Sequence, residues 1–128
     1  MAAAIGLRVY LGPAYKTGLT YVDGAGQLRQ HFDEARGLVG LEEALRFGHA
    51  IDGSHGGLVR AMQAPDRIET CTAELLRRTR DAARDHGYPV RLHCCQSAYE
   101  FSTARRRSAG WSSSAFWAPG SCCRTASM

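Results

Sequence analysis

A helical segment between two short apolar runs constrains the fold of this chain more than any other feature. Apolar residues recur on one face of residues 72–86, and Thr72 and Gly87 can cap the two ends of that helix. The runs 57–64 and 89–93, on either side, are typical of buried strands. A strand, a helix and a strand within about 40 residues form a βαβ unit, in which the two strands are parallel.

The segments before this unit predict one more strand and one more helix. Residues 5–11 form an apolar run that ends at Gly12 and Pro13, and residues 38–50 carry apolar side chains at helical spacing. The glycine-rich stretch 12–37 between them predicts an irregular, partly exposed excursion. The predicted fold class is therefore α/β, with about three parallel strands and their helices.

The charge distribution argues against a nucleic-acid partner. The net charge is +4, but residues 1–100 are neutral and the surplus positive charges all lie in the last 28 residues. No face interleaves basic and aromatic residues. No apolar run approaches the roughly 20 residues that span a bilayer, and the N-terminus lacks the features of a signal peptide. We therefore expect a soluble, cytoplasmic protein without a nucleic-acid or membrane partner.

The five cysteines predict reduced thiols. They are odd in number, and four of them form two vicinal pairs, 94–95 and 122–123. This arrangement fits neither a disulfide framework nor a CxxC metal knuckle, and reduced thiols agree with a cytoplasmic location. We expect Cys94 and Cys95 to be small core residues.

The composition divides the chain into residues 1–101 and residues 102–128. The second segment contains no Leu, Ile, Val, Asp or Glu, and it holds seven serines, both tryptophans and two cysteines. So few aliphatic side chains predict a Ser/Arg/Cys-rich tail of low order. One hypothesis is that this tail is translated out of frame, which the encoding DNA would decide.

His93 is the main candidate for chemistry. It ends the apolar run 89–93, and polar residues follow it at once, as at the C-terminal mouth of a buried strand. Imidazole is the commonest metal ligand in proteins, so a metal role is one interpretation; an ordinary core histidine is the alternative that spacing alone favours. The other four histidines are expected on the surface or in loops.

Three stretches resemble the amidohydrolase superfamily, in its cytosine-deaminase-like and triazine-hydrolase-like branch. They are residues 6–15, residues 62–72, and the strand ending at His93 together with Glu100. The resemblance implies that residues 1–101 are a fragment of a (β/α)8 TIM-type barrel, since a whole barrel takes about 250 residues.

The resemblance also implies a metal-dependent hydrolase. In that family a divalent zinc or iron ion lowers the pKa of its water to about 7, and the resulting hydroxide attacks carbon. The reaction implied is hydrolysis of a C–N or C–halogen bond of a small heterocyclic substrate.

The resemblance assigns roles to three residues. His93 matches a single histidine that binds the metal. Gln96 stands where deaminase-type members have a proton-shuttling Glu, and Gln63 stands where they often have a substrate-contacting His. Both glutamines are therefore expected to contact substrate. A neutral amide forms hydrogen bonds but does not accept and return a proton near neutral pH, so Gln96 departs from the deaminase pattern.

A second interpretation stays open. The family's His-x-His pair, its other single His and its Asp have no match in this chain, whereas a catalytic metal needs at least three protein ligands. The chain would then be a truncated, catalytically inactive fragment. By itself it would hold no metal. Its unpaired strand edges would favour aggregation or self-association.

Overall fold

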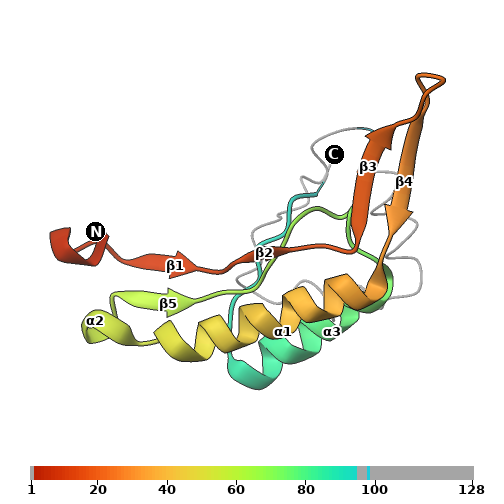
Figure 1. Cartoon of the computed structure of the whole chain (residues 1–128). Helices are drawn as coiled ribbons and strands as arrows, with labels where there is room; N and C mark the ends of the chain where they lie inside the picture. Colours follow the sequence, from red (N-terminus) through yellow and green to blue (C-terminus); the bar gives the residue numbers. More distant parts are fainter. Residues whose placement is uncertain (1, 95–97, 99–128) are drawn as a thin grey trace, which may run out of the picture.

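The structure is a computed structural model that describes residues 2–94 and Ala98 (Figure 1). The tail predicted over residues 102–128 and the predicted substrate-binding Gln96 lie outside these residues. None of the described helices combines the length and the apolar character needed to span a membrane.

Three parallel strand segments form one layer of the fold. The first segment consists of β1 (Val9–Leu11) and β2 (Ala14–Tyr15), and the second consists of β5 (Val59–Ala61) and β6 (Ala64–Pro65). β1 pairs with β5, and β2 pairs with β6, both in parallel.

A third segment adds to the other side of β5 and β6. It pairs through parallel bridges from Gln63 to Val90 and from Arg67 to His93. The α/β class with parallel strands is thereby confirmed.

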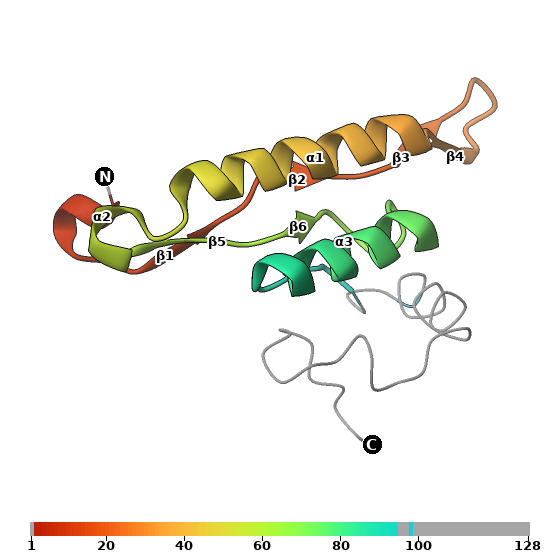
Figure 2. The same ribbon diagram turned by 90° about the horizontal axis from the view of Figure 1, so that it is seen from below.

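Two long helices connect these strand segments. α1 (Glu34–Ile51) lies between the first and second segments of the sequence, and α3 (Ala73–His86) lies between the second and third. Both helices pack on the same side of the strands (Figure 1), and they run side by side in the same direction (Figure 2). The structure also contains two short helical turns, η1 (Ala2–Ile5) and α2 (Ser54–Gly57).

The stretch 12–37 contains a β-hairpin, so the predicted irregular excursion was wrong. β3 (Gly18–Val22) and β4 (Leu28–Phe32) pair antiparallel, with Gly18 opposite Phe32 and Val22 opposite Leu28. The hairpin projects away from the helices (Figure 1). The glycines of this hairpin lie in the turn and at a strand end, and they do not prevent the strands from forming.

The helix predictions hold, with one change of length. α3 has the predicted caps: the Thr72 side chain accepts a hydrogen bond from the Leu75 amide at 3.2 Å, and Gly87 is left-handed with φ 67°. α1 is longer than the predicted 38–50 because the Asp33 side chain caps an earlier turn by accepting from the Arg36 amide.

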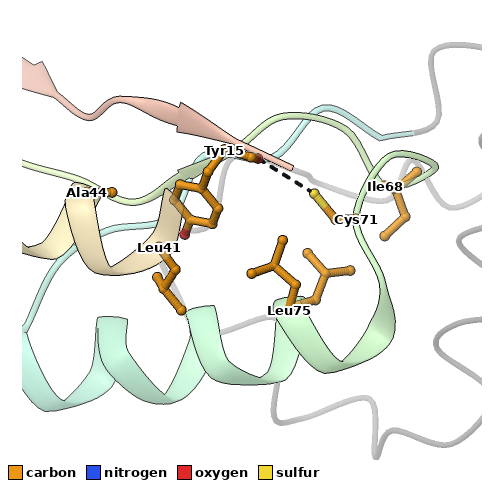
Figure 3. Packing of buried hydrophobic residues seen from close by; sticks show 7 residues of the cluster. Tyr15, Leu41, Ala44, Ile68, Cys71 and Leu75 are labelled. Atoms are coloured by element: carbon orange, nitrogen blue, oxygen red, sulfur yellow. Dashed lines mark hydrogen bonds between the residues drawn. The ribbon is translucent and has the colours of Figure 1, made fainter. Parts of the chain in front are cut away.

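The core lies between the strands and the two helices (Figure 3). Its buried residues come from β2, α1, α3 and the 66–72 loop that leads into α3: Tyr15, Leu41, Ala44, Ile68, Cys71, Leu75 and Leu76. Burial raises the pKa of the Cys71 thiol to about 11, so this cysteine is an inert core group at neutral pH.

A buried polar network crosses this core at Tyr15. Its hydroxyl donates to Gln63 Oε1 at 3.1 Å and lies 3.0 Å from the Thr79 hydroxyl of α3. Gln63 and Thr79 are both buried, and burial raises the pKa of the Tyr15 phenol above its usual range. Through the Tyr15 hydroxyl, the network connects the first strand segment with the second strand segment and with α3.

Gly12 marks the closest approach of two strand segments. A Cβ at this position would lie 2.2 Å from the Met62 carbonyl oxygen, and the Met62 amide donates to the Leu11 carbonyl at 2.9 Å in the same place. Only glycine lets these two backbones come together here.

Replacing Gly12 by Ala is expected to lower the free energy of unfolding by about 1–3 kcal/mol, because the methyl group must push the strands apart. Urea unfolding followed by circular dichroism measures this. Gly24→Ala is the matched control: no atom of the described residues lies within 4 Å of a Cβ there, so its effect should stay within about 0.5 kcal/mol. Equal unfolding midpoints for the two variants would contradict the strand contact.

Tyr15→Phe is expected to destabilise the fold by about 1–3 kcal/mol, because it leaves a buried Gln63 oxygen without its donor. The control is Tyr10→Phe, whose side chain is 57% exposed and which should change stability by no more than about 0.5 kcal/mol. The same urea experiment compares the two. A Tyr15→Phe variant as stable as Tyr10→Phe would show that the network contributes nothing.

Candidate functional site

The three strand segments end together at one edge, and His93 lies on that edge. The Asp66 amide donates to the Tyr15 carbonyl at 3.0 Å, which joins the ends of the first two segments. The Ile68 amide donates to the His93 carbonyl at 3.0 Å, and the His93 amide donates to the Asp66 carbonyl at 3.4 Å. These backbone hydrogen bonds fix the position of His93 relative to Asp66.

The His93 side chain lies on the face opposite the helices. Its neighbours Leu92 and Cys94 pack against the core between strands and helices. Because successive side chains along a strand point to opposite faces, His93 points away from that core. The residue is half-buried. This placement differs from that of a histidine enclosed among core aliphatics, although metal binding by His93 stays a prediction. Cys94 has the core role expected for it.

An ion pair lies beside His93 on the same edge. Lys16 Nζ is 3.5 Å from Asp66 Oδ2, and the Thr70 hydroxyl donates to the same oxygen at 3.4 Å. Lys16 follows Tyr15, which faces the helices, so the alternation of side chains places Lys16 on the face that His93 occupies. The edge therefore presents a cation, a carboxylate and an imidazole from three neighbouring strand segments. Sequence reasoning did not identify Lys16 or Asp66, although each directly follows a strand.

The loop that carries Asp66 is held rigidly to the first strand segment. The Thr17 and Gly18 amides both donate to the Thr70 carbonyl, at 3.1 and 2.7 Å. The Thr72 amide donates to the Thr17 hydroxyl at 3.0 Å, and the Thr72 hydroxyl donates to Glu34 of α1 at 2.9 Å. Backbone and side-chain hydrogen bonds thus position the loop from both sides.

Glu69 is a second carboxylate in this loop that the sequence did not single out. It is only 9% exposed; its Oε1 is 3.7 Å from an Arg67 guanidinium nitrogen, and its Oε2 has no hydrogen-bond partner among the described residues. A buried carboxylate with one unsatisfied oxygen is costly in a folded protein, so this oxygen has unused capacity to accept a donor.

Gln63 occupies a different position from His93. Its side chain is fully buried, and its oxygen accepts from Tyr15 on the helix side of the strands. Within the part of the chain that the structure describes, its Nε2 has no hydrogen-bond partner. The alternation of side chains along the strand places Val59 and Ala61 in the core, and it places Gln63 there as well. This alternation is visible in the sequence. The predicted contact of Gln63 with substrate stays a prediction, and in this conformation the amide serves the core.

The described residues do not supply a complete metal site. No group of three or more His, Cys, Asp or Glu side chains with metal-binding geometry occurs within residues 2–94. A catalytic zinc needs three protein ligands. His93 would be one ligand, and a set of three would have to include at least one ligand from outside the part of the chain described.

Comparisons with known proteins identify the relatives of this chain. The chain is 32% identical over 92 residues to 5-methylthioadenosine/S-adenosylhomocysteine deaminase 2 of Archaeoglobus fulgidus, a match that covers 72% of the chain and 22% of that enzyme. It is 28% identical over 76 residues to the 5′-deoxyadenosine deaminase of Methanosarcina barkeri, covering 59% of the chain and 18% of the enzyme. The chain therefore spans about a fifth of the length of the curated relatives it matches. No protein-family model matches it.

A solved structure shows the same fold over most of the chain. An adenosine deaminase from Xanthomonas campestris, with bound zinc, superposes with a TM-score of 0.52 and 16% identity. The match covers 82% of this chain and 21% of that enzyme. Together with the sequence relatives, it confirms the resemblance to the amidohydrolase superfamily: over the part that it covers, this chain is related to the deaminases of that superfamily.

Proposed function

We propose that this chain carries part of a metal-dependent hydrolase of the amidohydrolase type, which hydrolyses a C–N bond of a small heterocyclic substrate. The observation that carries the proposal is the position of His93. It stands at the C-terminal edge of three parallel strand segments, on the face away from the helices, in a chain whose relatives are deaminases. In barrels of parallel strands and helices, this edge is where chemistry takes place.

The proposed barrel fragment fits the observed topology. The order strand, helix, strand, helix, strand, with helices on one side of parallel strands, is a consecutive portion of a (β/α) barrel. The face carrying Lys16, Asp66 and His93 would then line the barrel interior. Backbone hydrogen bonds from both neighbouring segments would keep Asp66 and His93 in place there.

His93 is proposed as one ligand of a zinc or iron ion. Such an ion, when bound, would supply a water of lowered pKa. The described residues do not complete its coordination, so no step is assigned to them beyond holding the imidazole at the edge. Gln96 and Gln63 are proposed to contact substrate, Gln96 three positions after His93.

The relatives suggest the substrate class. Their names state activity on 5′-deoxyadenosine, 5-methylthioadenosine and S-adenosylhomocysteine. All of these are adenine nucleosides altered at the 5′ position of the ribose. We propose an adenine nucleoside of this kind, with release of ammonia from the ring carbon.

A second candidate is a chain without activity of its own. It is favoured by the finding that residues 2–94 bring together no three metal ligands. Metal content distinguishes the two candidates. A chain without a working site would bind no metal ion that is lost when His93 is replaced.

His93→Ala is expected to remove about one equivalent of bound zinc or iron from the purified chain, and with it any release of ammonia from 5′-deoxyadenosine. Elemental analysis and an ammonia assay measure the two effects. His31→Ala is the matched control, because His31 is an exposed residue of β4 and does not belong to the three parallel strand segments. Metal content unchanged by His93→Ala, or a wild-type chain free of metal, would favour the inactive candidate.

Gln96→Glu tests whether the reaction is deamination. A carboxylate at this position can accept and return a proton, and general acid–base catalysis contributes about 10²–10⁴-fold to rate. We expect the variant to release ammonia from 5′-deoxyadenosine at least about tenfold faster than the wild-type chain. A lower rate would contradict deamination. It would indicate that the neutral amide of Gln96 serves the hydrolysis of another kind of bond, such as a carbon–halogen bond.

A further inference from the structure

The C-terminal ends of α1 and α3 bring two histidines into contact. His49 lies in the last turn of α1, and His86 is the last residue of α3. The Nε2 atom of His49 is 3.2 Å from the Nδ1 atom of His86, and the ring centroids are 4.6 Å apart. When both rings are neutral, one of these nitrogens donates its N–H and the other presents a lone pair.

The neighbouring residues hold these rings in place. The Tyr88 ring stacks on His86, with centroids 5.6 Å apart and an angle of 28° between the planes. Gly48 lets Tyr88 approach α1, because a Cβ on Gly48 would lie 3.0 Å from the tyrosine ring. The Tyr88 amide donates to the Ala83 carbonyl at 2.9 Å, which fixes the tyrosine to the end of α3.

The surroundings suit a cation. The last turns of two helices that run in the same direction place their carbonyl ends in this region (Figure 2). These ends carry partial negative charge, so a positive ion there is stabilised. The nearby Asp52 carboxylate, which follows α1, is occupied by the Arg60 guanidinium at 2.9 Å and the Ala61 amide at 2.8 Å. Both histidines are exposed, so a dissolved ion can reach them.

We propose that His49 and His86 together bind a divalent transition metal ion, with water completing its coordination. Two imidazole nitrogens on one tetrahedral zinc, each at 2.0–2.1 Å, lie about 3.3 Å apart. The observed separation of 3.2 Å already matches this value, so small rotations of two exposed rings convert the contact into a chelate. The shared N–H moves to the far nitrogen of its own ring, so no proton is lost.

Imidazole selects the class of ion. It suits zinc, copper and nickel, whereas magnesium and calcium prefer oxygen ligands. With two protein ligands the site has fewer than the three of catalytic zinc sites, so it binds weakly and exchanges its ion. Bound metal would clamp the ends of α1 and α3 at the end of the strands opposite His93.

Thermal unfolding of the full chain with zinc as the probe tests this proposal. At a tenfold excess of zinc over its dissociation constant, the unfolding midpoint should rise by about 4 °C or more. In the His93→Ala background, which lacks the other proposed metal ligand, the rise should disappear in His49→Gln and His86→Gln, because glutamine keeps a hydrogen bond but is a poor zinc ligand. His31→Gln, which changes an exposed histidine elsewhere, should keep it. Magnesium should produce no rise.

Equilibrium dialysis against zinc provides a second measurement that does not require cooperative unfolding. The His49→Gln and His86→Gln variants should each bind about one equivalent less zinc than the wild-type chain and His31→Gln. Equal binding by all four proteins would overturn the proposal. Since His93→Ala leaves this pair intact, its loss of metal and theirs are separable, and the proposed hydrolase function can fail while this site stands.

Discussion

Tyr15 holds the described part of the molecule together. Its hydroxyl joins Gln63 of the second strand segment to Thr79 of α3, and its ring packs with α1 residues in the core. Its backbone carbonyl accepts from the Asp66 amide at 3.0 Å and from the Cys71 thiol at 3.9 Å. One residue thus sets both the spacing between strands and helices and the alignment of the strand ends. The edge that presents Asp66 and His93 depends on this alignment.

Local signals in the sequence were enough to predict both ends of α3. Thr72 and Gly87 mark the two ends of α3 because capping depends on a few neighbouring residues. The glycine-rich stretch 12–37 predicts an irregular excursion and not the hairpin, because glycines are typical of loops, although residues 19–22 are rich in residues that favour strands. The run predicted as a strand, 57–64, stops before Pro65, yet Pro65 lies within β6; the next amide, that of Asp66, continues the pairing.

The candidate site was predictable only in part, for a related reason. A strand ending in histidine is visible in a short stretch of sequence, and its position at the strand edge agrees with that expectation. The Lys16–Asp66 pair joins residues 50 positions apart, and the His49–His86 contact joins residues 37 apart. No periodicity links such residues, because the packing of separate elements creates these contacts. Gln63 differs: period-two alternation from Val59 already placed it toward the helices.

The strand pairings differ in how far apart their partners lie along the chain. Gln63 meets Val90 across 27 residues, whereas Val9 meets Val59 across 50 and must also accommodate the hairpin between them. Closing the shorter loop costs less chain entropy. On loop length alone, we therefore expect the segment from β5 through α3 to His93 to pair before the N-terminal strand docks on its edge.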